Sequence, residues 1–123
     1  MISGTVTRLL EATFLLEVRG GGEGLHQVAV IIDTGFSGDL TLPQSIIDSL
    51  DLPWLCRQQG MLADGRLHIF DVYTGTVEWG GLVRTIEIEA AEVEPLLGMS
   101  LLEGNRLSLE VRSGGTVVIE ELA

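Results

Sequence analysis

The chain has 123 residues, 46% apolar and 20% charged, so it is long enough for one domain with a real core and is not a disordered chain. Eighteen acidic residues against seven Arg and no Lys give a net charge of −11, which disfavours nucleic acid and anionic membranes as partners. The single Cys56 cannot form an internal disulfide and no secretory leader or bilayer-spanning apolar run is present, so we expect a cytoplasmic protein.

The first half of the chain is predicted to form strands separated by glycine turns. Segments 13–18 and 27–32 are expected to pair as a hairpin around the glycines at 20–24. The run 28–32 is continuously apolar, which indicates a strand buried on both faces. A short strand at 40–42 and a short helix at 43–50 follow.

Three more hairpins are predicted in the second half. Segments 55–63 and 66–73 flank Asp64-Gly65, a dipeptide typical of a two-residue turn with positive φ at both positions. Gly80-Gly81 and the segment 113–115 mark two further turns, and 99–103 is expected to form one or two helical turns. In 84–89 Ile alternates with Glu, which predicts buried isoleucines and a solvated face of glutamates. The pattern predicts a single all-β domain over 1–123, a barrel or sandwich with one or two short helices.

Asp33 is the main candidate for chemistry. It follows the most apolar run of the chain and precedes Thr34 and Gly35. A carboxylate in such a place is costly unless it is hydrogen-bonded, paired or half-protonated. The alternative for an isolated Asp-Thr-Gly is a residue that only caps a turn.

The surroundings of Asp33 carry a resemblance. The segment 31–43, IIDTGFSGDLTLP, resembles the active-site loop of retropepsin-like aspartic peptidases. Their second motif, two apolar residues and a Gly before a short helix, is matched by Leu96-Leu97-Gly98, and the hairpin at Asp64-Gly65 stands where the family has its flap. The likeness covers about 5–122 and is closer to single-domain bacterial and archaeal members than to viral ones. It implies a retropepsin-like closed β-barrel that is active as a two-fold homodimer.

The resemblance implies an aspartic endopeptidase. Two Asp33 carboxylates, one from each copy, would activate a water without any metal or cofactor, one taking its proton and the other protonating the scissile carbonyl of an extended peptide. The family roles assign catalysis to Asp33 and loop support to Thr34 and Gly35. Substrate binding falls to Gly35, Phe36, Asp64 and Gly65. Leu96, Leu97 and Gly98 would pack beneath the active loop. The terminal segments 1–6 and 117–122 are expected by analogy to pair across the dimer axis.

The chain also departs from the family. Viral enzymes commonly place Ala and then Asp after the Asp-Thr-Gly, and pair that Asp with an Arg after the second motif; here the positions hold Phe36, Ser37 and Met99. A catalytically silent domain of the same kind, which binds peptides or dimerises, is therefore the alternative function, and an unrelated barrel that binds a small ligand is a third.

Several roles outside the motifs stay open. Phe36 either narrows a pocket or packs in the core, and Asp39 either binds a substrate backbone or caps a turn. His26, His68 and Cys56 are too dispersed to predict a zinc site.

Overall fold

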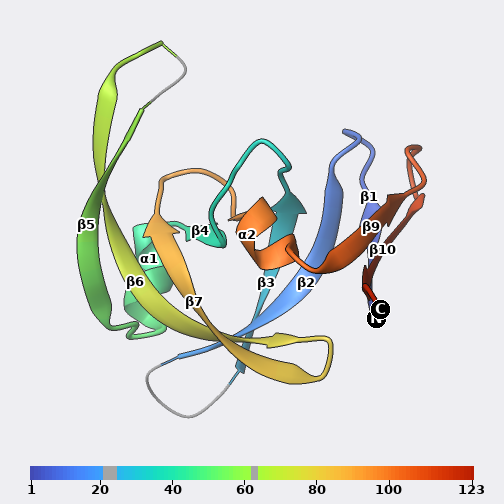
Figure 1. The fold of residues 1–123 in the computed structure, drawn as a ribbon, viewed down its shortest axis with the longest axis horizontal. Helices are drawn as coiled ribbons and strands as arrows, with labels where there is room; N and C mark the ends of the chain where they lie inside the picture. The colour runs from blue at the N-terminus through green and yellow to red at the C-terminus, as the bar shows by residue number, and fades with distance from the viewer. Residues whose placement is uncertain (21–24, 62–63) are drawn as a thin grey trace.

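A computed structural model describes residues 1–20, 25–61 and 64–123, and its strands form one ten-stranded sheet (Figure 1). The strands are β1 (Ile2–Val6), β2 (Ala12–Arg19), β3 (Leu25–Ile32), β4 (Leu40–Leu42), β5 (Trp54–Met61), β6 (Leu67–Trp79), β7 (Leu82–Ala90), β8 (Leu96–Leu97), β9 (Asn105–Leu109) and β10 (Thr116–Glu121). The two helices are α1 (Gln44–Ser49) and α2 (Met99–Leu102). The predicted all-β class with one or two short helices is confirmed, and the described residues contain two. Most of the predicted turn glycines at 20–24 lie outside the described residues.

Six strands close into a ring. The strand order is β5-β6-β7-β4-β8-β3-β2-β1-β10-β9, and an additional antiparallel pairing of β6 with β2 joins the ring that runs from β6 through β7, β4, β8 and β3 to β2. The hairpin of β5 and β6 projects from one side of this ring, while β1, β10 and β9 extend the sheet on the other side (Figure 1).

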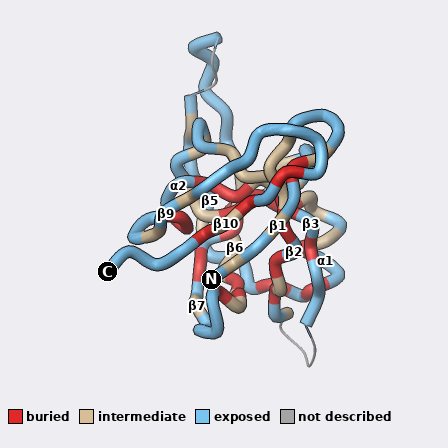
Figure 2. The backbone as a smooth tube through the Cα atoms, turned by 90° about the vertical axis from the view of Figure 1, so that its right-hand side faces the viewer, coloured by how far each residue is buried: buried red, intermediate tan, exposed pale blue. Residues whose placement is uncertain are grey.

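The interior of the ring is aliphatic, as the composition predicts. Alternate residues of β2 are buried (Phe14, Leu16 and Val18), and the rings of Phe14 and Trp79 pack edge to face. The buried segments run through the middle of the molecule in Figure 2. Burial of every second side chain is the pattern of a strand with one face toward the core and one toward solvent.

The same alternation corrects the prediction for 28–32. Val28 and Val30 are buried, but Ala29 is exposed and Ile31 and Ile32 are only half-buried. The strand has neighbours on both edges, β2 and β8, but only one of its faces looks into the ring. A continuous apolar run therefore does not mean two buried faces here. In β7 the predicted alternation is confirmed, with Ile86 and Ile88 buried.

Two predicted turns had different outcomes. Gly80 and Gly81 have φ of 58° and 89°, and Trp79 lies opposite Leu82, so the predicted two-residue turn is confirmed. At the other hairpin Met61 lies opposite Leu67, and Asp64 lacks the positive φ that the predicted two-residue turn requires at both positions, so this prediction is wrong. Of the turn's described residues only Gly65 has a positive φ, 85°; residues 62 and 63 lie outside the described residues.

The two terminal strands pair with each other within one chain. Ile2 lies opposite Ile119 and Thr5 opposite Thr116, while β9 is on the other side of β10 and β2 pairs with the end of β1 (Figure 2). The expected pairing of these strands across a dimer axis is therefore not what the fold provides. The end of the sheet on this side is β9. Within the described residues, no helix has the length and apolar character needed to cross a membrane.

Candidate active site

Asp33 stands directly after β3, in a tight turn that orients its carboxylate. The Gly35 N–H donates to Asp33 Oδ1 at 2.9 Å, and the Phe36 N–H donates to the Asp33 carbonyl at 3.1 Å. The Asp33 N–H in turn donates to the carbonyl of Leu97 at 2.9 Å. Asp33 is half-buried and Thr34 and Gly35 are exposed. The carboxylate is thus held by its own loop and open on one side.

The second motif, Leu96-Leu97-Gly98, packs against the loop 33–39 and bonds to it. Strand β8 lies parallel to the end of β3, with Ile32 opposite Leu97. The N–H groups of Gly98, Met99 and Ser100 then donate to the carbonyls of Asp39, Phe36 and Gly38 at 2.9, 2.8 and 3.2 Å. The structure therefore brings the two predicted motifs together. Backbone hydrogen bonds hold the loop 33–39, and no ion pair between described residues involves it.

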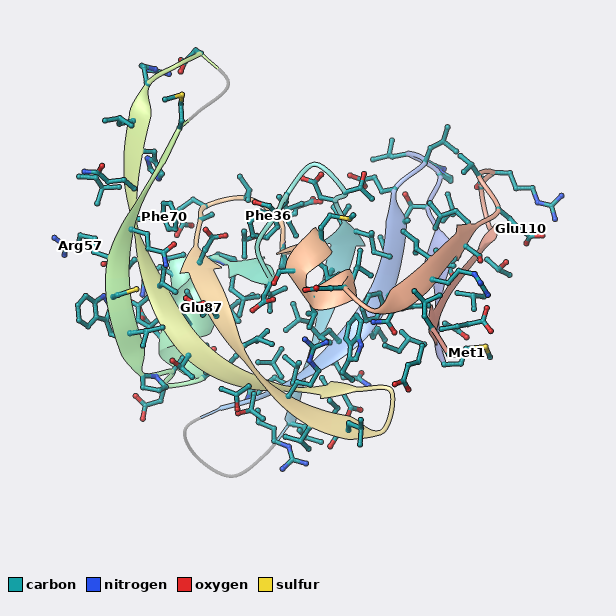
Figure 3. The ribbon with its side chains drawn as sticks, viewed as in Figure 1. Met1, Phe36, Arg57, Phe70, Glu87 and Glu110 are labelled. Atoms are coloured by element: carbon teal, nitrogen blue, oxygen red, sulfur yellow. The ribbon has the colours of Figure 1, made fainter. Side chains whose placement is uncertain are left out.

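The Phe36 ring lies between its own loop and the residue that follows β8. A Cβ added to Gly98 would lie 2.6 Å from Phe36 Cδ2, and one added to Gly38 would lie 2.6 Å from Phe36 Cζ. The ring is therefore packed against both glycines, and it is half-buried at the centre of the molecule in Figure 3. This contact supports the packing role of Phe36; whether the rest of the ring contacts a substrate stays a prediction.

An open hollow of about 400 Å³ lies beside Asp33 on the side of β9. Asp33, Thr34 and Glu11 form part of its wall together with apolar side chains from four segments. These are Leu10, Ala12, Ile31, Ile32, Leu96, Leu107 and Leu109. Leu10 and Leu109 are 59% and 42% exposed, so a large apolar surface adjoins the carboxylate.

An acidic hollow of about 230 Å³ lies on the other side of the loop, toward the hairpin. Its acidic wall consists of Asp39, Glu87 and Glu89. Burial, reinforced by the charges of Glu87 and Asp39, raises the pKa of the Glu89 carboxyl above its ordinary value. Asp39 Oδ2 accepts the N–H of Glu87, a residue within β7, at 3.1 Å. This bond joins the loop to a distant strand and is neither of the two roles considered for Asp39, so substrate binding by Asp39 stays a prediction.

Sequence reasoning missed Glu87 and Glu89 as part of this hollow. Their alternation with isoleucine predicted a solvated face, and Glu87 is indeed exposed. The parallel pairing of β4 with β7, which places Thr41 opposite Glu89, brings the glutamates beside the loop. A pairing between strands so far apart in sequence has no local signal in the residues.

The predicted tip residues stand apart from the Asp33 loop. Asp64 and Gly65 are exposed near the end of the projecting hairpin, where Asp64 accepts the Arg66 N–H and lies 2.6 Å from Arg66 Nε (Figure 1). Neither residue lines the two hollows beside Asp33. Their role over a substrate therefore stays a prediction. Within the described ranges no group of His, Cys, Asp and Glu is arranged to hold a metal ion.

Comparison with known proteins adds no family. No protein-family model matches the chain, and no curated protein matches it either. The arrangement of Asp33 and its surroundings is therefore what bears on the function of this chain.

Proposed function

We propose that this chain is an aspartic endopeptidase that is active as a two-fold homodimer. The observation that carries the proposal is the Asp33 turn: an oriented carboxylate, open on one side, on a loop tied to Leu97, Gly98 and Met99 by backbone hydrogen bonds. One chain offers one such carboxylate, and the proposed chemistry needs two.

The mechanism follows from the proximity of two identical carboxylates. Two such groups a few ångströms apart cannot both ionise, so one keeps a proton and the pair titrates as a unit. The ionised Asp33 takes a proton from a water, whose oxygen bonds to the scissile carbonyl carbon. The protonated Asp33 gives its proton to the carbonyl oxygen. The Asp33 that took the proton from water then gives it to the amide nitrogen, while the other Asp33 takes a proton from one hydroxyl of the tetrahedral intermediate. The C–N bond breaks, the products are an acid and an amine, and the pair again holds one proton.

The neighbouring residues support this arrangement. The exposed Thr34 is free to bond to the loop of the second copy, and the exposed Gly35 lets an extended peptide approach the backbone. The hairpin of β5 and β6 projects beyond the loop and would cover the bound peptide.

The test is cleavage of a diverse peptide pool from pH 4 to 7, read by mass spectrometry, with the wild-type protein beside Asp33→Asn. We expect Asp33→Asn to lower the cleavage rate by at least about 100-fold, the range of general acid–base catalysis. Asp51→Asn is the matched control, because Asp51 is exposed, lies outside both motifs and has a φ of 51° that Asn tolerates.

The same experiment addresses the alternative. Cleavage that survives in Asp33→Asn would overturn the proposed mechanism. Peptides that bind to the dimeric wild-type protein but are never cut would establish the silent peptide-binding domain instead.

A further inference from the structure

Strand β9 is an open edge of the sheet. Within the part of the chain that the structure describes, β9 pairs only with β10. The Glu110 N–H donates to Thr116 and the Leu122 N–H donates to Gly104, at 3.0 and 2.9 Å. Because antiparallel bonding alternates along a strand, the backbone groups of even-numbered residues face β10. Those of Asn105, Leu107 and Leu109 therefore point away from it, as a row of donors and acceptors for another strand.

This edge is complementary to itself. In an antiparallel pairing of β9 with its own copy, centred on Ser108, Leu107 lies opposite Leu109 and the outward backbone groups of both can bond. The same register places Arg106 opposite Glu110, twice by symmetry. The Glu110 carboxylate is already fixed, since it accepts the Thr116 hydroxyl at 2.7 Å. This bond lowers the Glu110 pKa, so Glu110 stays anionic opposite the arginine.

The edge is also continuous with the candidate active site. The side chains of Leu107 and Leu109 line the hollow that Asp33 and Thr34 share. A second copy on this edge would cover the exposed leucines and extend the hollow across the two-fold axis. The opposite end of the sheet, β5, belongs to the projecting hairpin and contributes no residue to that hollow (Figure 1). Figure 3 shows Arg57 of β5 and Glu110, just after β9, on opposite sides of the molecule.

We propose that a second copy of this chain docks on the β9 edge, in the antiparallel register centred on Ser108. The inference rests on the proposed function in one respect, the need for two Asp33 carboxylates in one site. It replaces the pairing of terminal strands across the axis with a continuous sheet in which three strands from each copy, β1, β10 and β9, meet at β9.

Charge reversal tests the edge. Arg106→Glu places Glu opposite Glu110, and Glu110→Arg places Arg opposite Arg106, so each variant alone should dimerise at least about tenfold more weakly than the wild type, because like charges directly opposite repel. An equimolar mixture restores both opposite-charge pairs and should form the mixed dimer. Sedimentation velocity measures these states, with thermal unfolding as the check that each variant is folded.

Arg57→Glu is the matched control. It makes the same change in net charge on the other end of the sheet, where Arg57 is exposed. Weaker dimerisation in Arg57→Glu but not in Arg106→Glu would overturn the proposal in favour of β5. Equal dimerisation of all variants would overturn it as well.

A cross-link tests the register independently. A non-hydrogen-bonded antiparallel pair has Cα atoms about 4.5 Å apart, which a disulfide can bridge. In a Cys56→Ser background, Ser108→Cys should therefore oxidise to a covalent dimer, whereas Ser113→Cys in the exposed turn should not. A dimer by sedimentation that fails to cross-link through position 108 would overturn the register.

These measurements do not depend on catalysis. A cross-linked dimer that cuts no peptide would reject the peptidase and leave the interface intact. If Arg106→Glu leaves dimerisation unchanged and the dimer cleaves peptides, the β9 interface is rejected and the peptidase is retained.

Discussion

Two neighbouring carboxylates of the acidic hollow, Asp39 and Glu89, have opposite effects on the stability of the fold. Asp39 joins its loop to two other segments. Its side chain accepts the N–H of Glu87 in β7, and its carbonyl accepts the N–H of Gly98, directly after β8. Glu89 has no such partner among the described residues and is half-buried beside two like charges. At neutral pH the first therefore stabilises the loop and the second costs free energy.

Glu89→Gln should raise the stability of the folded protein at pH 7. A carboxyl whose pKa is raised on folding binds more protons in the folded state than in the unfolded state. Its cost therefore appears as pH rises above the ordinary value of 4.5 and persists at neutral pH. Because the side chain is partly exposed, we expect a gain of only about 0.5 kcal/mol in the free energy of unfolding.

Urea unfolding at pH 7 and pH 4 measures this effect. The difference between Glu89→Gln and the wild type should shrink at pH 4, where the glutamate of the wild type is largely protonated. The exposed Glu94→Gln serves as control and should show neither change. A gain that is larger at pH 4 than at pH 7 would contradict the explanation.

At the scale of elements, the loop 33–39 depends on β8 and the start of α2. Three consecutive N–H groups of Gly98, Met99 and Ser100 bond to carbonyls of the loop, and the ring of Phe36 lies over Gly98. Gly98 has a φ of −105°, which any residue adopts. Glycine is needed here for the close approach of the loop and not for backbone freedom.

Gly98→Ala should therefore destabilise the protein through overlap. Its Cβ would meet the carbonyl oxygen of Gly38 and the Phe36 ring, and the cost of overpacking is about 1–3 kcal/mol. Gly60→Ala is the control, because there the nearest atom is the edge of the Phe70 ring at 3.1 Å, which can move aside. Thermal unfolding measures both, and equal stability of the two variants would contradict the role given to Gly98.

Local patterns predicted most of the elements. The turn at Gly80-Gly81, the helix after Pro43 and the alternation in β7 each have a signal within a few residues, and the structure has all three. The prediction failed where the outcome depends on register, as between Met61 and Leu67, and where burial depends on distant partners, as for Ala29.

The candidate site likewise has parts that local sequence patterns predict and parts that they do not. The residues of the two motifs were predicted from the sequence, and the structure brings them into contact. The acidic hollow and the apolar wall of Leu10, Leu107 and Leu109 were not predicted, because they arise from segments up to about a hundred residues apart. Terminal strand pairing was predicted between copies and is found within the chain.

At the scale of the whole molecule, one chain supplies half of the proposed site. Mixing wild type with Asp33→Asn at equal concentrations, under conditions where both are dimeric and exchange, should therefore leave about one quarter of the activity of the same total amount of wild type, since only dimers with two Asp33 are competent. The peptide assay measures this dependence. A residual activity of one half would mean that each chain acts alone.

Strand β6 belongs to the projecting hairpin and to the ring at once. It is a single strand of 13 residues that pairs with β5 from Leu67 to Tyr73, with β7 from Val72 to Trp79 and with β2 from Thr76 to Glu78. The β6 arm of the hairpin is therefore continuous with the ring, and no loop interrupts it between Leu67 and Trp79. A movement of the projecting part of β6 would have to bend this strand, and the bending would act on β7 and β2, the ring strands with which β6 pairs.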